Sequence, residues 1–209
     1  MSTHTLTIAI LGAGNIGGTL GKKWHAAGHQ VAFGINNPES PKVQAVRSDL
    51  GDTVVISSIA DVLAKNPDVV VLAIPGKAVD EVLATYAAQL DKRIIIDATN
   101  RVGETTMHSL EVFEKHAPQA QVFRAFNTLG WENFADPYFD GIQADLFYCG
   151  PEGEARSTVE GLIGDVGLRG VYLGGPDKVG LVDAAAGLWF ALVFGQGKSR
   201  HLAFKVLER

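Results

Sequence analysis

Short apolar runs alternate along this chain with segments in which apolar residues recur at helical spacing. The run at 68–74 is apolar at nearly every position, which is typical of a strand buried on both faces of a sheet. The first run, Ile8–Leu11, passes directly into a glycine-rich turn. Further strands are predicted at 30–34, 53–56, 93–100, 120–126, 145–150 and 170–174.

Segments with helical spacing lie between most of these predicted strands. They predict helices at 20–27, 59–65, 79–86, 108–116 and 152–165, and a C-terminal pair within 177–209 separated by a break at Gly195–Gly197. Strands that alternate with helices in this way predict an α/β fold of the Rossmann type, with a doubly wound parallel sheet. We expect a dinucleotide-binding domain over residues 1–150 and, packed on it, a short, mostly helical α/β extension over residues 151–209.

The turn after the first predicted strand has the pattern G-x-G-x-x-G. In a dinucleotide fingerprint the first glycine makes the tight turn, the second lets the backbone approach a diphosphate, and the third lets helix and strand pack closely. The diphosphate sits at the helix N-terminus, where free N–H groups and the helix dipole favour an anion. We therefore expect this turn to bind the cofactor through Gly12, Ala13, Gly14, Asn15, Ile16 and Gly17. A glycine turn without a ligand is the alternative.

Asn36 and Asn37 follow the second predicted strand, where an acidic residue would bind the ribose hydroxyls of NAD and an arginine would accept the additional phosphate of NADP. The chain has neither residue there, and the lack of a carboxylate removes a repulsion against phosphate. Lys42 and Arg47 add positive charge just downstream. We expect NADP as the cofactor, with NAD as the alternative, and both asparagines as contacts; turn formation alone would also explain them.

Further candidate ligand contacts stand where later strands end. Ile74 and Pro75 close the strand at 68–74, Thr99 and Asn100 close the strand at 93–100, and Asn127 follows the strand at 120–126. Right-handed crossovers bring the ends of parallel strands to one edge of the sheet, where ligands bind in open α/β folds. We expect these five residues to face one crevice.

Composition narrows the class of partner. The formal net charge is −5 and no basic cluster stands out, which argues against nucleic acid. Cys149 is the only cysteine, so no disulfide forms within the chain, and the histidines show no metal-ligand spacing with it. Met1–Thr5 lacks the basic region of a signal peptide, and the apolar run Leu188–Phe194 is too short to span a bilayer. These patterns predict a cytoplasmic protein without a metal site or membrane contact.

Several motifs, taken in their order and spacing, resemble the deazaflavin (coenzyme F420)-dependent NADP oxidoreductase family over essentially the whole chain. These motifs are Gly12–Gly18, Ala73–Pro75, Asp97–Asn100, Arg124–Thr128 and Ala203–Leu207. The resemblance implies hydride transfer between NADPH and a deazaflavin or flavin-like acceptor. It also implies that Gly12–Gly17 hold the diphosphate, that Ile74 and Pro75 line the adenosine and ribose path, and that Asn100 and Asn127 lie near the nicotinamide and the acceptor.

Two positions depart from the family pattern. After the second strand the family often has a serine or threonine and an arginine, or an arginine alone, and this chain has Ile35-Asn36-Asn37 instead. After the fifth strand the family has a proline next to the asparagine, and this chain has Arg101 after Asn100. Arg101 adds a positive charge at the crevice edge and could bind an acidic acceptor, although an exposed loop arginine is the alternative. Trp131 could wall an acceptor ring or belong to the core or a dimer interface.

Hydride transfer between two heterocycles needs alignment and exclusion of water more than acid or base groups, so we assign no catalytic residue. One alternative is a dehydrogenase of small hydroxy acids or imines, although such enzymes usually carry a further helical domain. Another is a non-catalytic dinucleotide sensor. The apolar C-terminal helix predicts a homodimer.

Overall fold

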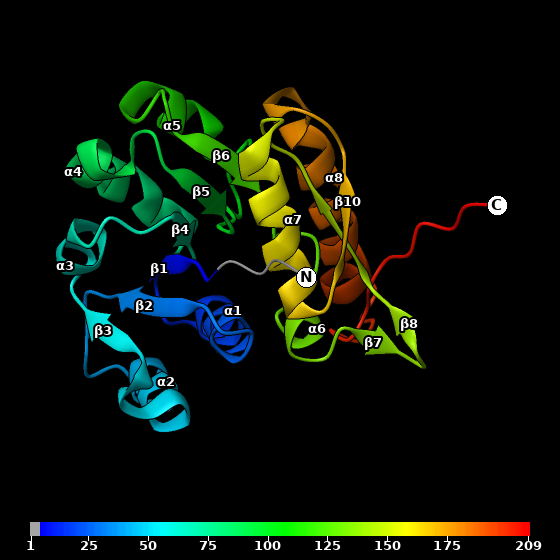
Figure 1. Cartoon of the computed structure of the whole chain (residues 1–209). Coiled ribbons are helices and arrows are strands. Elements are labelled where there is room, and N and C mark those ends of the chain that lie inside the picture. The colour runs from blue at the N-terminus through cyan, green and yellow to red at the C-terminus, as the bar shows by residue number, and fades with distance from the viewer. Residues whose placement is uncertain (1–4) are drawn as a thin grey trace.

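Six strands form a parallel sheet in the order β3-β2-β1-β4-β5-β6 in the computed structural model, which describes residues 5–209 (Figure 1). Because β1 pairs with both β2 and β4, the strand order reverses between β1 and β4, and the predicted doubly wound parallel sheet is confirmed. Residues 1–4, on which part of the signal-peptide expectation rests, lie outside the described residues. The strands are β1 Thr7–Leu11, β2 Gln30–Gly34, β3 Val55–Ser57, β4 Val69–Leu72, β5 Ile94–Asp97 and β6 Gln121–Arg124.

The carboxyl ends of the central strands lie level with one another. The register pairs Leu11 with Gly34 on one side and with Leu72 on the other. It continues from Leu72 to Asp97, and from Asp97 to Arg124. The segments that follow these strands therefore leave the sheet along one edge, as the crossover rule predicted.

Helices cover both faces of the sheet. Ile8 and Ile10 of β1 belong to a core with α1, α2 and α7, whereas Ala9 and Leu11 belong to a second core with α3, α4 and α5. Figure 1 shows α3, α4 and α5 together on the side of the sheet away from α7 and α8. Burial on both faces explains the continuous apolarity of the strands. The helices are α1 Asn15–Ala26, α2 Pro41–Leu50, α3 Ile59–Ala64, α4 Val79–Leu90, α5 Leu110–His116, α6 Glu132–Ala135, α7 Glu154–Val166 and α8 Val179–Phe190. Single turns of 3₁₀-helix lie at Gly51–Thr53, Gly76–Ala78 and Pro176–Lys178.

Helix α2 was not predicted, although its start carries two recognised signals. The Ser40 hydroxyl accepts a hydrogen bond from the Val43 backbone N–H at 3.3 Å, and Pro41 occupies the first turn. The hairpin of β7 (Tyr138–Phe139) and β8 (Ile142–Gln143) was also missed. Its turn is Asp140-Gly141, with both residues at positive φ, which is a common hairpin signal.

The strand predicted at 145–150 forms, but it does not extend the large sheet. It is β9, Asp145–Tyr148, and it pairs in parallel with β10, Arg169–Tyr172, in a separate two-stranded sheet. An antiparallel bridge between Arg124 and Cys149 joins this small sheet to the end of β6. The small sheet therefore takes one strand from each side of residue 150, and it lies against the end of β6 that carries the predicted crevice.

The predicted second C-terminal helix is wrong. Helix α8 continues into a π-helical turn, Ala191–Gly195, and residues 196–209 form no helix. Hydrogen bonds to the rest of the protein hold this tail in an extended path. Among them, the Trp189 indole donates to the Leu202 carbonyl, the Asp145 N–H to the Phe204 carbonyl and the Val206 N–H to the Asp145 carboxylate. Tertiary bonds to the tail backbone therefore replace the bonds that a helix would have made.

The apolar C-terminal helix is longer than the run Leu188–Phe194 suggested. Pro176–Gly195 forms 20 residues of continuous helix with a mean hydropathy of 1.5, which by length and composition alone suffices to cross a membrane. One face of it packs on the protein through Val182, Ala186 and Trp189. Only 22% of the residues in its most apolar window are buried, and the others are half-buried or exposed. The cytoplasmic location stays a prediction.

Candidate functional site

The three glycines of the turn after β1 have three different surroundings. Gly12 has φ +105°, and an added Cβ would lie 2.5 Å from the Ala73 carbonyl oxygen. A Cβ on Gly17 would lie 2.1 Å from the Gly12 carbonyl oxygen, so only glycine lets α1 approach the turn. A Cβ on Gly14, in contrast, would meet no atom within 4 Å. Gly14 therefore opens onto free space at the point where α1 begins.

The N-terminus of α1 is free to bind an anion. Gly14 is its N-cap, no side chain caps it, and its first turn carries no acidic residue. The first N–H groups of a helix have no partner within the helix, and the helix dipole places partial positive charge at them. The open face of Gly14 and these N–H groups form a cradle that fits the diphosphate of a dinucleotide.

A pocket of about 210 Å³ lies beside this cradle, on the β2 side of the sheet. Asn36, Asn37 and Ile74, which were each predicted to contact the cofactor, all line it. Among the described residues that line it, Lys42 is the one charged residue and no carboxylate occurs. The pocket is lined by Gly12, Ala13, Gly14, Gly34, Ile35, Asn36, Asn37, Ser40, Lys42, Val43, Ile59 and Ile74.

The start of α2 supplies further positive potential to this pocket. Ser40, which caps the helix, and Lys42, in its first turn, both line the pocket. The Asn37 carboxamide oxygen accepts from the Glu39 N–H at 3.0 Å, so Asn37 also shapes the turn that leads into α2. The pocket thus meets a helix N-terminus and a lysine, which together favour a phosphate group.

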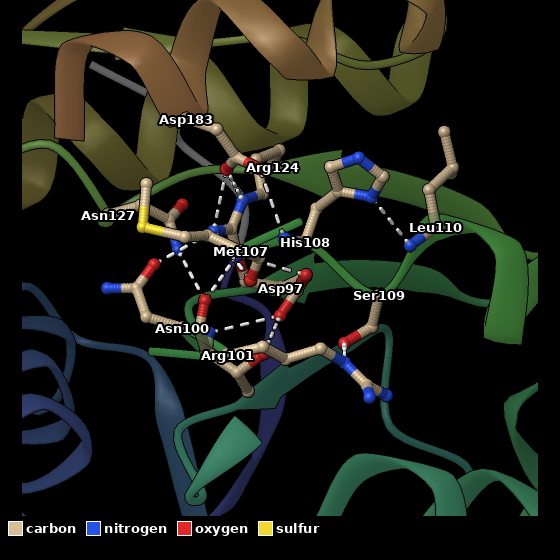
Figure 2. A network of polar contacts seen from close by, with 11 residues as sticks. Asp97, Asn100, Arg101, Met107, His108, Ser109, Leu110, Arg124, Asn127 and Asp183 are labelled. Atoms are coloured by element: carbon tan, nitrogen blue, oxygen red, sulfur yellow. Dashed lines mark hydrogen bonds and ion pairs between the residues drawn. The ribbon is translucent and has the colours of Figure 1, made fainter. Parts of the chain in front are cut away.

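The Arg124 side chain is the centre of a polar network on the other side of the cradle (Figure 2). The side chain is 3% exposed and comes from the last residue of β6. Its guanidinium donates to Asp97 at the end of β5 (3.1 Å), to Asp183 on α8 (2.9 and 3.0 Å) and to the side-chain oxygen of Asn100 (2.8 Å). It donates also to the carbonyl oxygens of Thr99 and Met107.

Thr99 lies inside this network. Its N–H and its hydroxyl both donate to the Asp97 carboxylate, at 3.0 and 2.6 Å, and the residue is 2% exposed. Its carbonyl oxygen accepts from Arg124 and from the Asn127 side-chain amide, the latter at 3.0 Å. The structure thus brings Thr99, Asn100 and Asn127 together, as expected. Their contact with a cofactor stays a prediction.

The backbone is strained just after β6, at the residue that precedes Asn127. Phe126 has φ +66°, which is unusual for a bulky residue, and packs edge-on against Trp24 and Phe134 in the core. The side-chain oxygens of Asn127 and Thr128 are buried, and neither has a hydrogen-bond partner in the described structure. Strain and unmet hydrogen bonds of this kind cluster at functional sites.

Arg101 and Trp131 occupy environments that the sequence did not specify. The Arg101 guanidinium is bound by Asp80 at 2.7 Å, by Glu104 at 3.2 Å and by the Ser109 hydroxyl at 2.9 Å, and its side chain is 10% exposed. Figure 2 shows it directed away from Asn100 and Asn127. Trp131 is half-buried and packs against the core that contains α1 and α7. A role for either residue toward an acceptor is still a prediction.

Cys149 lies beneath the same network. It lines a small cavity of about 10 Å³ with Asp97, His108 and Arg124. Burial raises the pKa of its thiol to about 11, against a smaller opposite effect of the Arg124 charge. The thiol is therefore protonated at neutral pH and is a poor nucleophile.

The sequence analysis missed Arg124 and Asp183 as site residues. Both carried a signal, because each is a charged residue inside an apolar element: Arg124 in Val122–Phe126 and Asp183 in Leu181–Trp189. A charge in such a setting is almost never fully buried without a partner. Nothing in the sequence showed that the two residues pair with each other, since 59 positions separate them.

A family comparison fits this arrangement. Residues 7–101 match the NADP oxidoreductase, coenzyme F420-dependent family. The matched segment is just under half of the chain and contains the glycine turn, the β2-side pocket and the end of β5. Over these residues the resemblance to the F420-dependent NADP oxidoreductases is therefore confirmed, and that family consists of NADP-dependent oxidoreductases.

Solved structures share the fold. A candidate F420-dependent NADP-reductase from Arthrobacter sp. FB24 is 24% identical, with a TM-score of 0.83 over 97% of this chain and 100% of that chain. A pyrroline-5-carboxylate reductase from Coxiella burnetii is 16% identical, with a TM-score of 0.67 over 94% of this chain and 73% of that one. A reductive aminase from Aspergillus terreus in complex with NADPH is 17% identical, with a TM-score of 0.61 over 93% and 62%. At these identities the likeness shows the Rossmann-type fold.

Proposed function

We propose that this protein transfers a hydride between NADP(H) and a deazaflavin or flavin-like acceptor. The observation that carries the proposal is the glycine turn, in which Gly12 and Gly17 are enclosed whereas Gly14 opens onto free space at the start of α1. A purely structural turn needs the first and third glycines, but it has no need of the second. The family match of residues 7–101 supports NADP as the cofactor and a deazaflavin as its partner.

The pocket on the β2 side supports NADP over NAD. An NAD-specific site places a carboxylate on the ribose hydroxyls, and the described lining of this pocket contains none. Lys42 and the N-terminal end of α2 offer positive potential for the additional phosphate, and Asn36 offers an amide donor. The nicotinamide half of the cofactor would then extend across β1 toward the ends of β4 and β5.

The residues at that end of the crevice suit a ring acceptor. Asp97 is held by Arg124 and Thr99, and Arg101 is held by Asp80 and Glu104, so these charged groups are already engaged. When bound, NADPH supplies the hydride, and an acceptor ring that delocalises the resulting charge needs no acid from the protein. The task of Asn100 and Asn127 is to align the two rings and exclude water.

A reductase of small imines or hydroxy acids is the second candidate, because the fold is shared with a pyrroline-5-carboxylate reductase and a reductive aminase. This chain covers 73% and 62% of those two chains, so each contains a substantial part without a counterpart here. We therefore place this candidate behind the deazaflavin reductase.

The experiment that tests the proposal is a turnover assay. The purified protein is mixed with NADPH and 8-hydroxy-5-deazaflavin, and loss of the deazaflavin's visible absorbance is followed, with NADH, free flavin and a cyclic imine as parallel arms. We expect bleaching with NADPH. Gly14→Val should abolish it, whereas Gly164→Val, on α7, should retain it, because its added side chain also meets open space but lies outside the crevice. Imine reduction without bleaching would favour the second candidate. NADPH binding without turnover of any acceptor would contradict the proposal and favour a non-catalytic sensor.

The proposal includes a homodimer formed through α8. Leu181 and Leu188 lie two helical turns apart on one face of α8 and are 54% and 52% exposed, and Phe194 in the next turn is 65% exposed. A helix face of this kind is typical of a protein–protein interface. Light scattering should show a dimer that Leu188→Arg converts to a monomer, whereas Ile142→Arg, at a residue that is 57% exposed on β8, should leave it dimeric. A wild-type monomer at high concentration would refute this part.

A further inference from the structure

We infer that Arg124 is a positioning residue for the nicotinamide half of the cofactor: it holds the loop that follows β5, Ala98–Arg101, and its ion pair with Asp183 ties that loop to α8. The inference rests on the proposed function, because it takes the crevice to be a dinucleotide site. It goes further by assigning a task to a buried arginine and to the C-terminal helix.

The contacts of Arg124 account for this task. Its guanidinium binds two groups of the loop directly, the Thr99 carbonyl oxygen and the Asn100 side-chain oxygen. It binds Asp97, which in turn accepts from the N–H and hydroxyl of Thr99. All of its donor nitrogens are therefore engaged, and three of the five residues that accept from it, Asp97 included, fix the loop.

The loop lines the part of the crevice where the nicotinamide half of the cofactor would lie. The diphosphate cradle stands at the end of β1, and the pocket with Asn36 stands on the β2 side of it. A dinucleotide crosses such a sheet at the point where the strand order reverses, which here is between β1 and β4. Since the adenosine half occupies the β2 side, the other half extends over β4 and β5, where Asn100 lies.

Asp183 connects this loop to the C-terminal helix. Its carboxylate accepts from Nε and Nη2 of Arg124, and its other oxygen accepts from the His108 N–H at 3.1 Å. Met107, the preceding residue, gives its carbonyl oxygen to Arg124 at 3.2 Å. Helix α8, the 101–109 segment and the loop after β5 thus meet at one guanidinium (Figure 2).

Replacing Arg124 with lysine tests the hydrogen-bond geometry of the guanidinium while the positive charge is kept. A lysine would keep the positive charge between Asp97 and Asp183, which are 3% and 13% exposed and would otherwise be left as uncompensated buried charges. It would supply three donors on one atom instead of five on a planar fork, so it cannot reach the carboxylates and the loop oxygens at once. Arg124→Lys should therefore loosen the loop in a chain that still folds.

The test compares two probes that share the adenosine half. NADPH contacts the whole crevice, whereas 2′,5′-ADP lacks the nicotinamide and contacts only the cradle and the β2-side pocket. We expect Arg124→Lys to weaken NADPH binding about tenfold, the size of one lost charged hydrogen bond, and to leave 2′,5′-ADP binding within about twofold. The emission of bound NADPH, which comes from the nicotinamide ring, should shift toward that of the free cofactor. Arg169→Lys is the matched control, because Arg169 also pairs with a buried carboxylate, Asp145, but in the small sheet.

Each outcome has a distinct meaning. The inference would be overturned if Arg124→Lys bound each probe as tightly as wild type does and left the NADPH emission unchanged. It would also be overturned if Arg124→Lys weakened both probes equally, or if Arg169→Lys showed the same selective loss of NADPH binding. If Arg124→Lys fails to fold, Asp183→Asn, which keeps the shape and removes the charge, should show the same selective loss to a smaller degree, and no selective loss there would overturn the inference. A wild-type protein that binds neither probe would instead refute the proposed function, and this inference with it.

Discussion

One added methyl group should affect stability at Gly17 but ligand binding at Gly14, although the two glycines are only three positions apart. In Gly17→Ala the new Cβ would lie 2.1 Å from the Gly12 carbonyl oxygen and 3.1 Å from Ile10 and Ala73, so α1 would have to move away from β1. In Gly14→Ala the new Cβ would meet nothing within 4 Å. The first change affects the fold, and the second affects only what approaches from outside.

The magnitudes follow from this difference. Overpacking against a backbone oxygen costs about 1–3 kcal/mol, which at about 2–4 °C per kcal/mol for a chain of this size lowers the melting temperature of Gly17→Ala by roughly 2–12 °C. Gly14 has φ −72° and ψ −170°, which alanine adopts without strain. The gain from a stiffer unfolded chain and the loss of a glycine N-cap then roughly cancel, to within about 0.5 kcal/mol.

The assay combines thermal unfolding with 2′,5′-ADP binding by calorimetry. Gly14→Ala should melt within about 2 °C of wild type yet bind the probe at least about tenfold more weakly, because its methyl group lies where the probe's 5′-phosphate, the adenosine-side phosphate of the dinucleotide, would bind. The main effect of Gly17→Ala should be a lower melting temperature. A Gly14→Ala protein with wild-type affinity would refute the reasoning, because the open face at Gly14 would then have no ligand to receive.

Three further predictions concern other parts of the structure. Asn36→Arg should raise the ratio of NADPH to NADH affinity, because the β2-side pocket holds Asn36 beside Lys42; an unchanged ratio would place discrimination elsewhere. Burial raises the pKa of Asp145, but hydrogen bonds from Arg169, Lys205 and the Val206 N–H outweigh it and hold that pKa below the usual range of an aspartate, so its stabilisation is present above the ordinary aspartate pKa and is lost as the pH falls through the lowered value. Acid titration of the melting temperature should therefore be flatter in Asp145→Asn, and an identical acid profile would contradict the pairing. Cys149, with a pKa of about 11, should react with iodoacetamide at pH 8 far more slowly in the native than in the urea-unfolded protein; equal rates would show that it is not buried.

Part of the candidate site was readable from residues close together in the chain. Gly12, Gly14 and Gly17 act within one turn, and continuous runs of apolar residues predicted the strands before and after them. The same local reasoning failed for the segment after Gly195, because the backbone of residues 200–206 bonds mostly to residues elsewhere in the chain, namely Asn133, Asp145, Arg169 and Trp189. It missed α2 although the signals of Ser40 and Pro41 were present.

The sequence by itself determined the doubly wound sheet, the glycine cradle and the edge at which the strands end, because periodicity and turn chemistry depend on neighbours in the chain. Only the tertiary structure decided which charged groups pair with each other and which of them lie at the site. Arg101, expected at the crevice edge, is bound by Asp80 and Glu104, whereas Arg124 is buried between Asp97 and Asp183 at the base of the site. A charged side chain takes its role from the groups that surround it in space, and those groups come from strands and helices far apart in the sequence.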